Sequence, residues 1–171
     1  MKKVIIIHGW GSGPNEHWYQ DEKKLLEGEG YEVCVPLMPD TDLPILEKWL
    51  EALEGLKPDE DTVLIGHSLG VPTILRYLEN GKNKVCKAIL IAGFAESLGL
   101  NETNNFVEKP FDWEMIKKGA KEFVAINQID DPWVPLEVGK RLASNLDVEI
   151  VEVQGDNHFD TMDLDLINSN L

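Results

Sequence analysis

The chain has 171 residues, 43% of them hydrophobic, with five tryptophans and five phenylalanines, and this composition excludes an intrinsically disordered protein. Its formal net charge is −15, from 31 acidic and 16 basic residues. A field of this sign repels phosphate backbones and anionic lipid head groups, so we expect neither nucleic acid nor a membrane as a partner.

The first apolar run, residues 4–7, ends at His8 and is shorter than the hydrophobic region of a signal peptide. No other run approaches the roughly 20 apolar residues of a membrane span. The two cysteines, Cys34 and Cys86, fit no metal-ligand spacing and are expected to be reduced thiols. The sequence therefore predicts a cytoplasmic protein of one domain over residues 1–171, without a metal or a cofactor.

Short apolar runs alternate along the chain with longer segments of helical periodicity. The runs expected to form strands are residues 4–7, 33–35, 63–65, 88–92, 123–126 and 148–153. The segments expected to form helices are residues 18–30, 46–53, a stretch that ends near residue 80, and 135–145. This alternation predicts a parallel sheet covered by helices on both faces, because right-handed crossovers place the helices there.

The polarity of these runs predicts their order in the sheet. Four runs are almost continuously apolar, as the interior strands of a parallel sheet are. The second run, together with Glu32 before it, alternates in polarity, and the sixth contains Glu149 and Glu152. Polar positions suit the edges of a sheet, so we expect six mostly parallel strands in the order 2-1-3-4-5-6.

Gly66-His67-Ser68-Leu69-Gly70 matches the Gly-x-Ser-x-Gly pattern of a nucleophile elbow. The pattern directly follows an apolar strand and precedes a helix, which is the setting that it requires. Backbone amides at a helix N-terminus favour developing negative charge, so Ser68 is the candidate nucleophile. The alternative is that Ser68 only caps the helix. His67 is expected to pack beneath the turn.

The candidate base and acid follow from chain order, which for this motif is Ser, then Asp or Glu, then His. Of the four histidines, only His158 comes after the last expected strand. The acid belongs after the fifth strand, where Asp130 and Asp131 stand before a proline-rich stretch. An acid followed by x-x-Val-Pro at the start of a helix is typical of hydrolase acid loops, and this register favours Asp131. Asp130 stays the alternative, with an exposed or helix-capping side chain as its other interpretation.

The loop after the first strand is rich in glycine and suits an oxyanion hole. The backbone N–H groups of Trp10 and Leu69 are the candidate donors. A dinucleotide phosphate loop is disfavoured, because Pro14 stands where that pattern needs glycine or alanine. The histidines also match no zinc-binding spacing.

Together these motifs resemble those of the small, cap-less serine hydrolases of the YdeN-like and retinoblastoma-binding serine hydrolase type. The matching segments, in chain order, are His8-Gly9-Trp10, His17-Trp18, residues 36–39, Trp49-Leu50, residues 66–70, Asp130-Asp131-Pro132 and His158-Phe159. The resemblance covers nearly the full chain and implies a minimal α/β-hydrolase fold without a cap domain. It also implies Ser68 as nucleophile, Asp131 as acid and His158 as base. One departure is Asn157, where relatives often have glycine.

These residues predict hydrolysis of a small carboxylic ester, the expected small-molecule partner, through an acyl-enzyme at Ser68. Lids in this fold usually enter after the fourth strand, and the segment there, residues 94–118, is too short for a lipase-type lid. Two alternatives stay open, namely an amidase or peptidase with the same triad and a catalytically weak protein-binding module.

Overall fold

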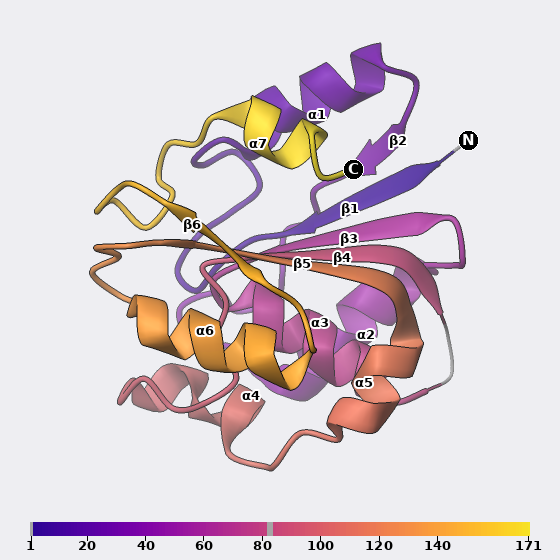
Figure 1. The fold of residues 1–171 in the computed structure, drawn as a ribbon. Helices are drawn as coiled ribbons and strands as arrows, with labels where there is room; N and C mark the ends of the chain where they lie inside the picture. The colour runs from indigo at the N-terminus through magenta and orange to yellow at the C-terminus, as the bar shows by residue number, and fades with distance from the viewer. Residues whose placement is uncertain (1, 82–83) are drawn as a thin grey trace.

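The computed structural model of the protein describes residues 2–81 and 84–171, which form one parallel sheet of six strands with helices around it (Figure 1). The strands are β1 (Lys3–Ile7), β2 (Glu32–Cys34), β3 (Thr62–His67), β4 (Val85–Ile91), β5 (Ala120–Gln128) and β6 (Ile150–Val153). Their order is β2-β1-β3-β4-β5-β6, and every pair of neighbours is parallel. The predicted fold class and strand order are confirmed.

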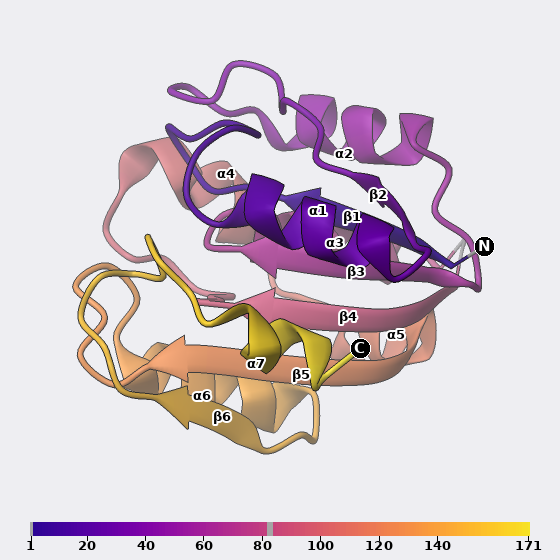
Figure 2. The same ribbon diagram turned by 90° about the horizontal axis from the view of Figure 1, so that it is seen from above.

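Helices cover both faces of the sheet, as the two views show (Figures 1 and 2). One face carries α1 (Tyr19–Gly28) and α7 (Leu164–Asn168). The other face carries α2 (Leu46–Gly55), α3 (Gly70–Glu79), α4 (Asn104–Val107), α5 (Trp113–Gly119) and α6 (Leu136–Asn145). In the described part of the chain, none of these helices has the length and apolar character needed to cross a membrane.

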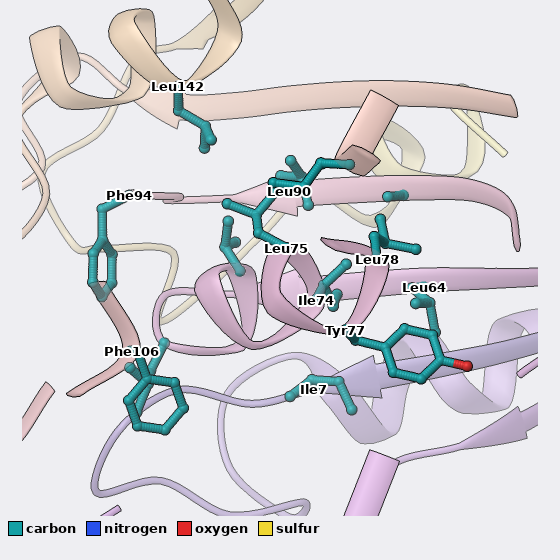
Figure 3. Packing of buried hydrophobic residues seen from close by; sticks show 14 of the residues in the cluster. Ile7, Leu64, Ile74, Leu75, Tyr77, Leu78, Leu90, Phe94, Phe106 and Leu142 are labelled. Atoms are coloured by element: carbon teal, nitrogen blue, oxygen red, sulfur yellow. The ribbon is translucent and has the colours of Figure 1, made fainter. Parts of the chain in front are cut away.

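Each face of the sheet has its own hydrophobic core. Successive side chains of a strand point to opposite faces, and in β1 this sends Ile5 and Ile7 into one core and Val4 and Ile6 into the other. The larger core lies between the sheet and α3, where side chains of the helix, the strands and Phe106 meet (Figure 3). An interior strand must therefore be apolar on both faces, which explains why four of the six runs are nearly free of polar residues.

The register brings the ends of four neighbouring strands together. Ile7 of β1 pairs with Gly66 of β3, His67 pairs with Ile91 of β4, and Ile91 pairs with Ile126 of β5. Because the strands are parallel, the loops that follow them open at the same edge of the sheet. In open α/β sheets this carboxyl edge is where ligands bind.

Periodicity did not predict the short elements between β4 and β5. They are the 3-10 turn η1 (Asn101–Thr103), α4 and α5, and elements of this length carry too little pattern to be recognised. Arg76 of α3 binds this segment by hydrogen bonds to the carbonyl oxygens of Phe106, Lys109 and Pro110, and these bonds hold the segment against α3. Within the described residues the segment therefore forms a wall beside the sheet edge, and no cap domain covers that edge.

Candidate active site

Ser68 stands on a tight turn between β3 and α3. Its φ is 53°, in the left-handed region that costs a non-glycine residue about 1–2 kcal/mol. A Cβ at Gly66 would lie 2.9 Å from the backbone of Gly70, and one at Gly70 would lie 2.2 Å from the carbonyl oxygen of Ile7. The turn therefore requires both glycines. Leu69, the residue after Ser68, occupies the cap position of α3 and makes no cap hydrogen bond with its side chain.

Asp131 and His158 meet at the carboxyl edge of the sheet. The two carboxylate oxygens of Asp131 lie 2.9 and 2.8 Å from Nδ1 of His158. One of these oxygens also accepts the backbone N–H groups of Trp133 and Val134, at 2.8 and 2.9 Å. Burial by itself raises the pKa of Asp131, but the hydrogen bonds from His158 and the two amides outweigh it and hold that pKa below its usual value. Asp130, the alternative acid, is exposed.

His67 is buried beneath the elbow and supports the loop that carries His158. Its Nε2 lies 2.9 Å from the carbonyl oxygen of His158, and its Nδ1 lies 2.6 Å from the hydroxyl of Tyr19. Because a carbonyl oxygen can only accept, Nε2 is the donor and Nδ1 accepts from Tyr19. Burial, followed by the charge of His158, lowers the pKa of His67 to about 3 and keeps its ring neutral. Both ring nitrogens of His67 are therefore used in hydrogen bonds, one to the backbone of His158 and one to Tyr19.

Ser68 and His158 line one cavity of about 320 Å³ at this edge. Since Nδ1 of His158 is held by Asp131, Nε2 is the ring nitrogen left for a partner inside the cavity. The wall is mostly apolar and includes Trp10, Leu69, Phe94, Leu98, Trp133 and Val134. No group of three or more His, Cys, Asp or Glu side chains within residues 2–81 and 84–171 could hold a metal ion.

The loop after β1 lies against the elbow, and a Cβ at Gly9 would come within 3.2 Å of the Cβ of Ser68. His8 is buried, which lowers its pKa and keeps the ring neutral. Its Nε2 accepts the backbone N–H of Met38 at 3.0 Å, so its Nδ1 is the donor to the carbonyl oxygen of Gly9 at 2.8 Å. The carbonyl and N–H of a trans peptide point in opposite directions. The bond from His8 therefore turns the N–H of Trp10 away from His8.

Gln128, the last residue of β5, binds the loop that carries His158, and no motif in the sequence indicated this role. Its side-chain amide hydrogen-bonds to Asn157 and Phe159, the residues on either side of His158. The signal that could have identified it is a polar side chain at the carboxyl end of a buried interior strand.

The chain is similar in sequence to known hydrolases. A family model described as serine hydrolase matches residues 4–163. The chain belongs to the serine hydrolase family. YdeN of Bacillus subtilis, described as a hydrolase, is 37% identical over 163 residues, covering 92% of this chain and 86% of that protein. The serine hydrolase RBBP9 of Rattus norvegicus is 31% identical over 163 residues, covering 92% of this chain and 87% of its own.

Structural similarity agrees with this assignment to the serine hydrolase family. The crystal structure of YdeN matches this chain with a TM-score of 0.92 and 35% identity, covering 99% of this chain and 98% of YdeN.

A more distant sequence relative is an Arabidopsis thaliana protein described as chloroplastic methylesterase 14. It is 30% identical over 77% of this chain, which spans only 41% of that relative. Family membership supports hydrolase activity on an α/β-hydrolase fold, and the resemblance drawn from the motifs is confirmed.

Proposed function

We propose that the protein hydrolyses small carboxylic esters by acyl transfer to Ser68, with His158 as the base and Asp131 as the acid that orients it. The observation that carries this proposal is the short contact between the Asp131 carboxylate and Nδ1 of His158, whose ring lines the same cavity as Ser68 on the nucleophile elbow. An Asp–His pair beside an elbow serine supports the proposal, because a Ser-His-Asp triad needs such a pair to activate the hydroxyl.

In the first half of the reaction, Nε2 of His158 takes the proton of the Ser68 hydroxyl while Oγ bonds to the ester carbonyl carbon. Asp131 stabilises the imidazolium ion through the Nδ1–H bond. The tetrahedral intermediate then expels the alcohol, which takes the proton from His158, and the acyl group stays on Ser68. In the second half, a water molecule gives its proton to His158 and attacks the acyl carbon, and the acid is released as Ser68 regains its proton.

The oxyanion of both intermediates needs backbone donors, and the proposal assigns this role to the N–H groups of Trp10 and Leu69. The support for Trp10 is the bond from His8 to the Gly9 carbonyl, which fixes the orientation of the Gly9–Trp10 peptide. Removal of one such donor typically costs about 3 kcal/mol of transition-state stabilisation.

The size and lining of the cavity support a small, apolar acyl or alcohol group. A volume of about 320 Å³ is near the lower end for ligand pockets, which span roughly 300–1,000 Å³. Phe94, Leu98 and Val134 supply apolar surface next to the nucleophile. The methylesterase relative also favours ester chemistry, and acyl transfer by this triad uses no cofactor.

Replacement of the nucleophile tests the proposal. Ser68→Ala is expected to lower kcat/KM for p-nitrophenyl acetate by about 10³-fold or more, with an unchanged circular dichroism spectrum. Ser144→Ala on the exposed surface of α6 is the matched control and is expected to behave as wild type. If Ser68→Ala kept the kcat/KM of wild type, the assignment of Ser68 as the nucleophile would be wrong.

Two further measurements separate the alternatives. A p-nitroanilide of the same acyl group is expected to be turned over more slowly than the ester, and the reverse order would indicate an amidase or peptidase. Wild-type protein is expected to form a covalent adduct with a fluorophosphonate, and the lack of an adduct would indicate a protein-binding module. A series of esters of increasing acyl length then measures how much of the cavity an acyl chain can fill.

A further inference from the structure

The loop that carries His158 is bent into a conformation that needs external support. The φ angles of His158 and Phe159 are 54° and 55°. Two successive non-glycine residues in the left-handed region cost about 1–2 kcal/mol each, and such a conformation persists only where the surrounding contacts hold it. A loop that relaxed to a negative φ at position 158 would carry the imidazole away from Asp131.

Gln128 makes three hydrogen bonds to this loop. Its Oε1 accepts the backbone N–H groups of Asn157 and Phe159, each at 3.2 Å. Its Nε2 donates to Oδ1 of Asn157 at 2.8 Å. Gln128 is only 4% exposed, so water has little access to its side of these bonds. A single buried amide therefore binds the chain directly before and directly after His158.

The approach of the loop to Gln128 is close enough to require glycine at position 155. A Cβ on Gly155 would lie 2.5 Å from Nε2 of Gln128, and the φ of Gly155 is 152°. The carbonyl oxygen of Gly155 also accepts the backbone N–H of Asp130 at 3.1 Å. The loop is thus fastened to the end of β5 by both backbone and side chain.

Asn157 supplies the other half of this contact. Its Oδ1 receives the bond from Gln128, and its Nδ2 donates to Oγ1 of Thr161 at 3.0 Å. Glycine at this position would have no side chain with which to make either bond. The side chain of Asn157 is therefore an integral part of the loop.

We infer that Gln128 is a positioning residue that holds His158 in line with Asp131, acting through Asn157 and the backbone on both sides of the histidine. The inference rests on the proposed role of His158 as the base. His67 also binds the backbone of His158, but it belongs to the elbow, so its replacement would disturb Ser68 as well. Gln128 lies outside the elbow and outside the cavity lining, and its role can be tested separately.

The test is Gln128→Met, which keeps the length of the side chain and removes all three hydrogen bonds. Because a base displaced by about 1 Å can cost up to about 100-fold in rate, kcat for p-nitrophenyl acetate is expected to fall about 10- to 100-fold. KM is expected to stay within about twofold, because the cavity wall is unchanged. The rate of fluorophosphonate labelling of Ser68 is expected to fall by the same factor as kcat. Gln154→Met, in an exposed position just before the loop, is the matched control and is expected to match wild type.

Asn157→Ala removes only one of the three bonds to Gln128, so its loss of kcat is expected to be smaller. The double variant is expected to lose less than the product of the two single losses, because both changes remove the bond between the side chains of Gln128 and Asn157. If Gln128→Met does not fold, Asn157→Ala tests the inference by itself. It is then expected to lower kcat without changing KM.

Wild-type kcat in a folded Gln128→Met, a rise in KM with kcat unchanged, or fully additive losses in the double variant would each overturn the inference. These outcomes leave Ser68-dependent labelling of the wild-type protein intact. Loss of that labelling in wild type itself would instead overturn the proposed function, and the role of Gln128 with it.

Discussion

The buried carboxyl group of Glu22 makes the stability of the protein depend on pH. Glu22 lies on the inward face of α1, is 0% exposed, and neither of its carboxyl oxygens has a hydrogen-bond partner among the described residues. Burial, with a smaller contribution from the charge of Glu29, raises the pKa of Glu22 from 4.5 to about 7. We predict that Glu22→Gln, which cannot ionise, removes a loss of stability that wild type suffers as the pH rises.

The direction and size of this effect follow from proton linkage. Between pH 4.5 and about 7 the folded state keeps a proton on Glu22 that the unfolded state has released, so the free energy of unfolding falls as the pH rises. Each pKa unit corresponds to about 1.4 kcal/mol, so the full loss is about 3 kcal/mol. About 2–3 kcal/mol of it falls between pH 5 and pH 8.

Urea unfolding of wild type and Glu22→Gln at pH 5 and pH 8 measures this difference directly. From pH 5 to pH 8, the free energy of unfolding of Glu22→Gln is expected to rise by about 2–3 kcal/mol relative to that of wild type. Glu51→Gln, in an exposed position on α2, is the matched control and is expected to change stability by less than about 0.5 kcal/mol at either pH. If the free energy of unfolding of Glu22→Gln changed with pH in parallel with that of wild type, Glu22 would not be the source of the pH dependence.

Two more predictions address the acid and the elbow. Asp131→Asn is expected to lower kcat by about 10³- to 10⁴-fold while Asp130→Asn stays within about twofold of wild type, and steady-state kinetics showing the opposite ranking would reassign the acid. Gly70→Ala places a Cβ 2.2 Å from the carbonyl oxygen of Ile7 and is expected to destabilise the fold by about 3 kcal/mol in thermal or urea unfolding. Gly55→Ala, where a Cβ meets nothing within 4 Å, is expected to be neutral or slightly stabilising, and equal losses in the two variants would show that the elbow is not tightly packed.

The architecture of the sheet could be read from the sequence because strand polarity reports position directly. Glu32 marks β2 and Glu152 marks β6, and the structure places these strands at the two edges. The short helix α5 was missed, although Asp112 caps it by accepting the backbone N–H of Met115. A cap signal without a longer amphipathic repeat was too little to indicate a helix.

The site could be predicted only as far as its local motifs reached. The elbow around Ser68 is encoded in five consecutive residues, whereas the support of His158 depends on how a distant loop returns to β5. Gln128 and Asn157 are separated by 29 positions along the chain, and no spacing rule links them. The preference for Asp131 came from the x-x-Val-Pro register, whereas the two backbone amides that hold its carboxylate are brought to it only by the folded loop.

The proposed mechanism depends on activation of Ser68 by His158. Peptide mass spectrometry of the fluorophosphonate-treated protein, with labelling rates for wild type and His158→Ala, measures this activation. We expect one adduct, on the peptide that contains Ser68, and labelling slowed by about 10³-fold or more in His158→Ala. An adduct on another residue, or a His158→Ala variant labelled at the wild-type rate, would contradict it.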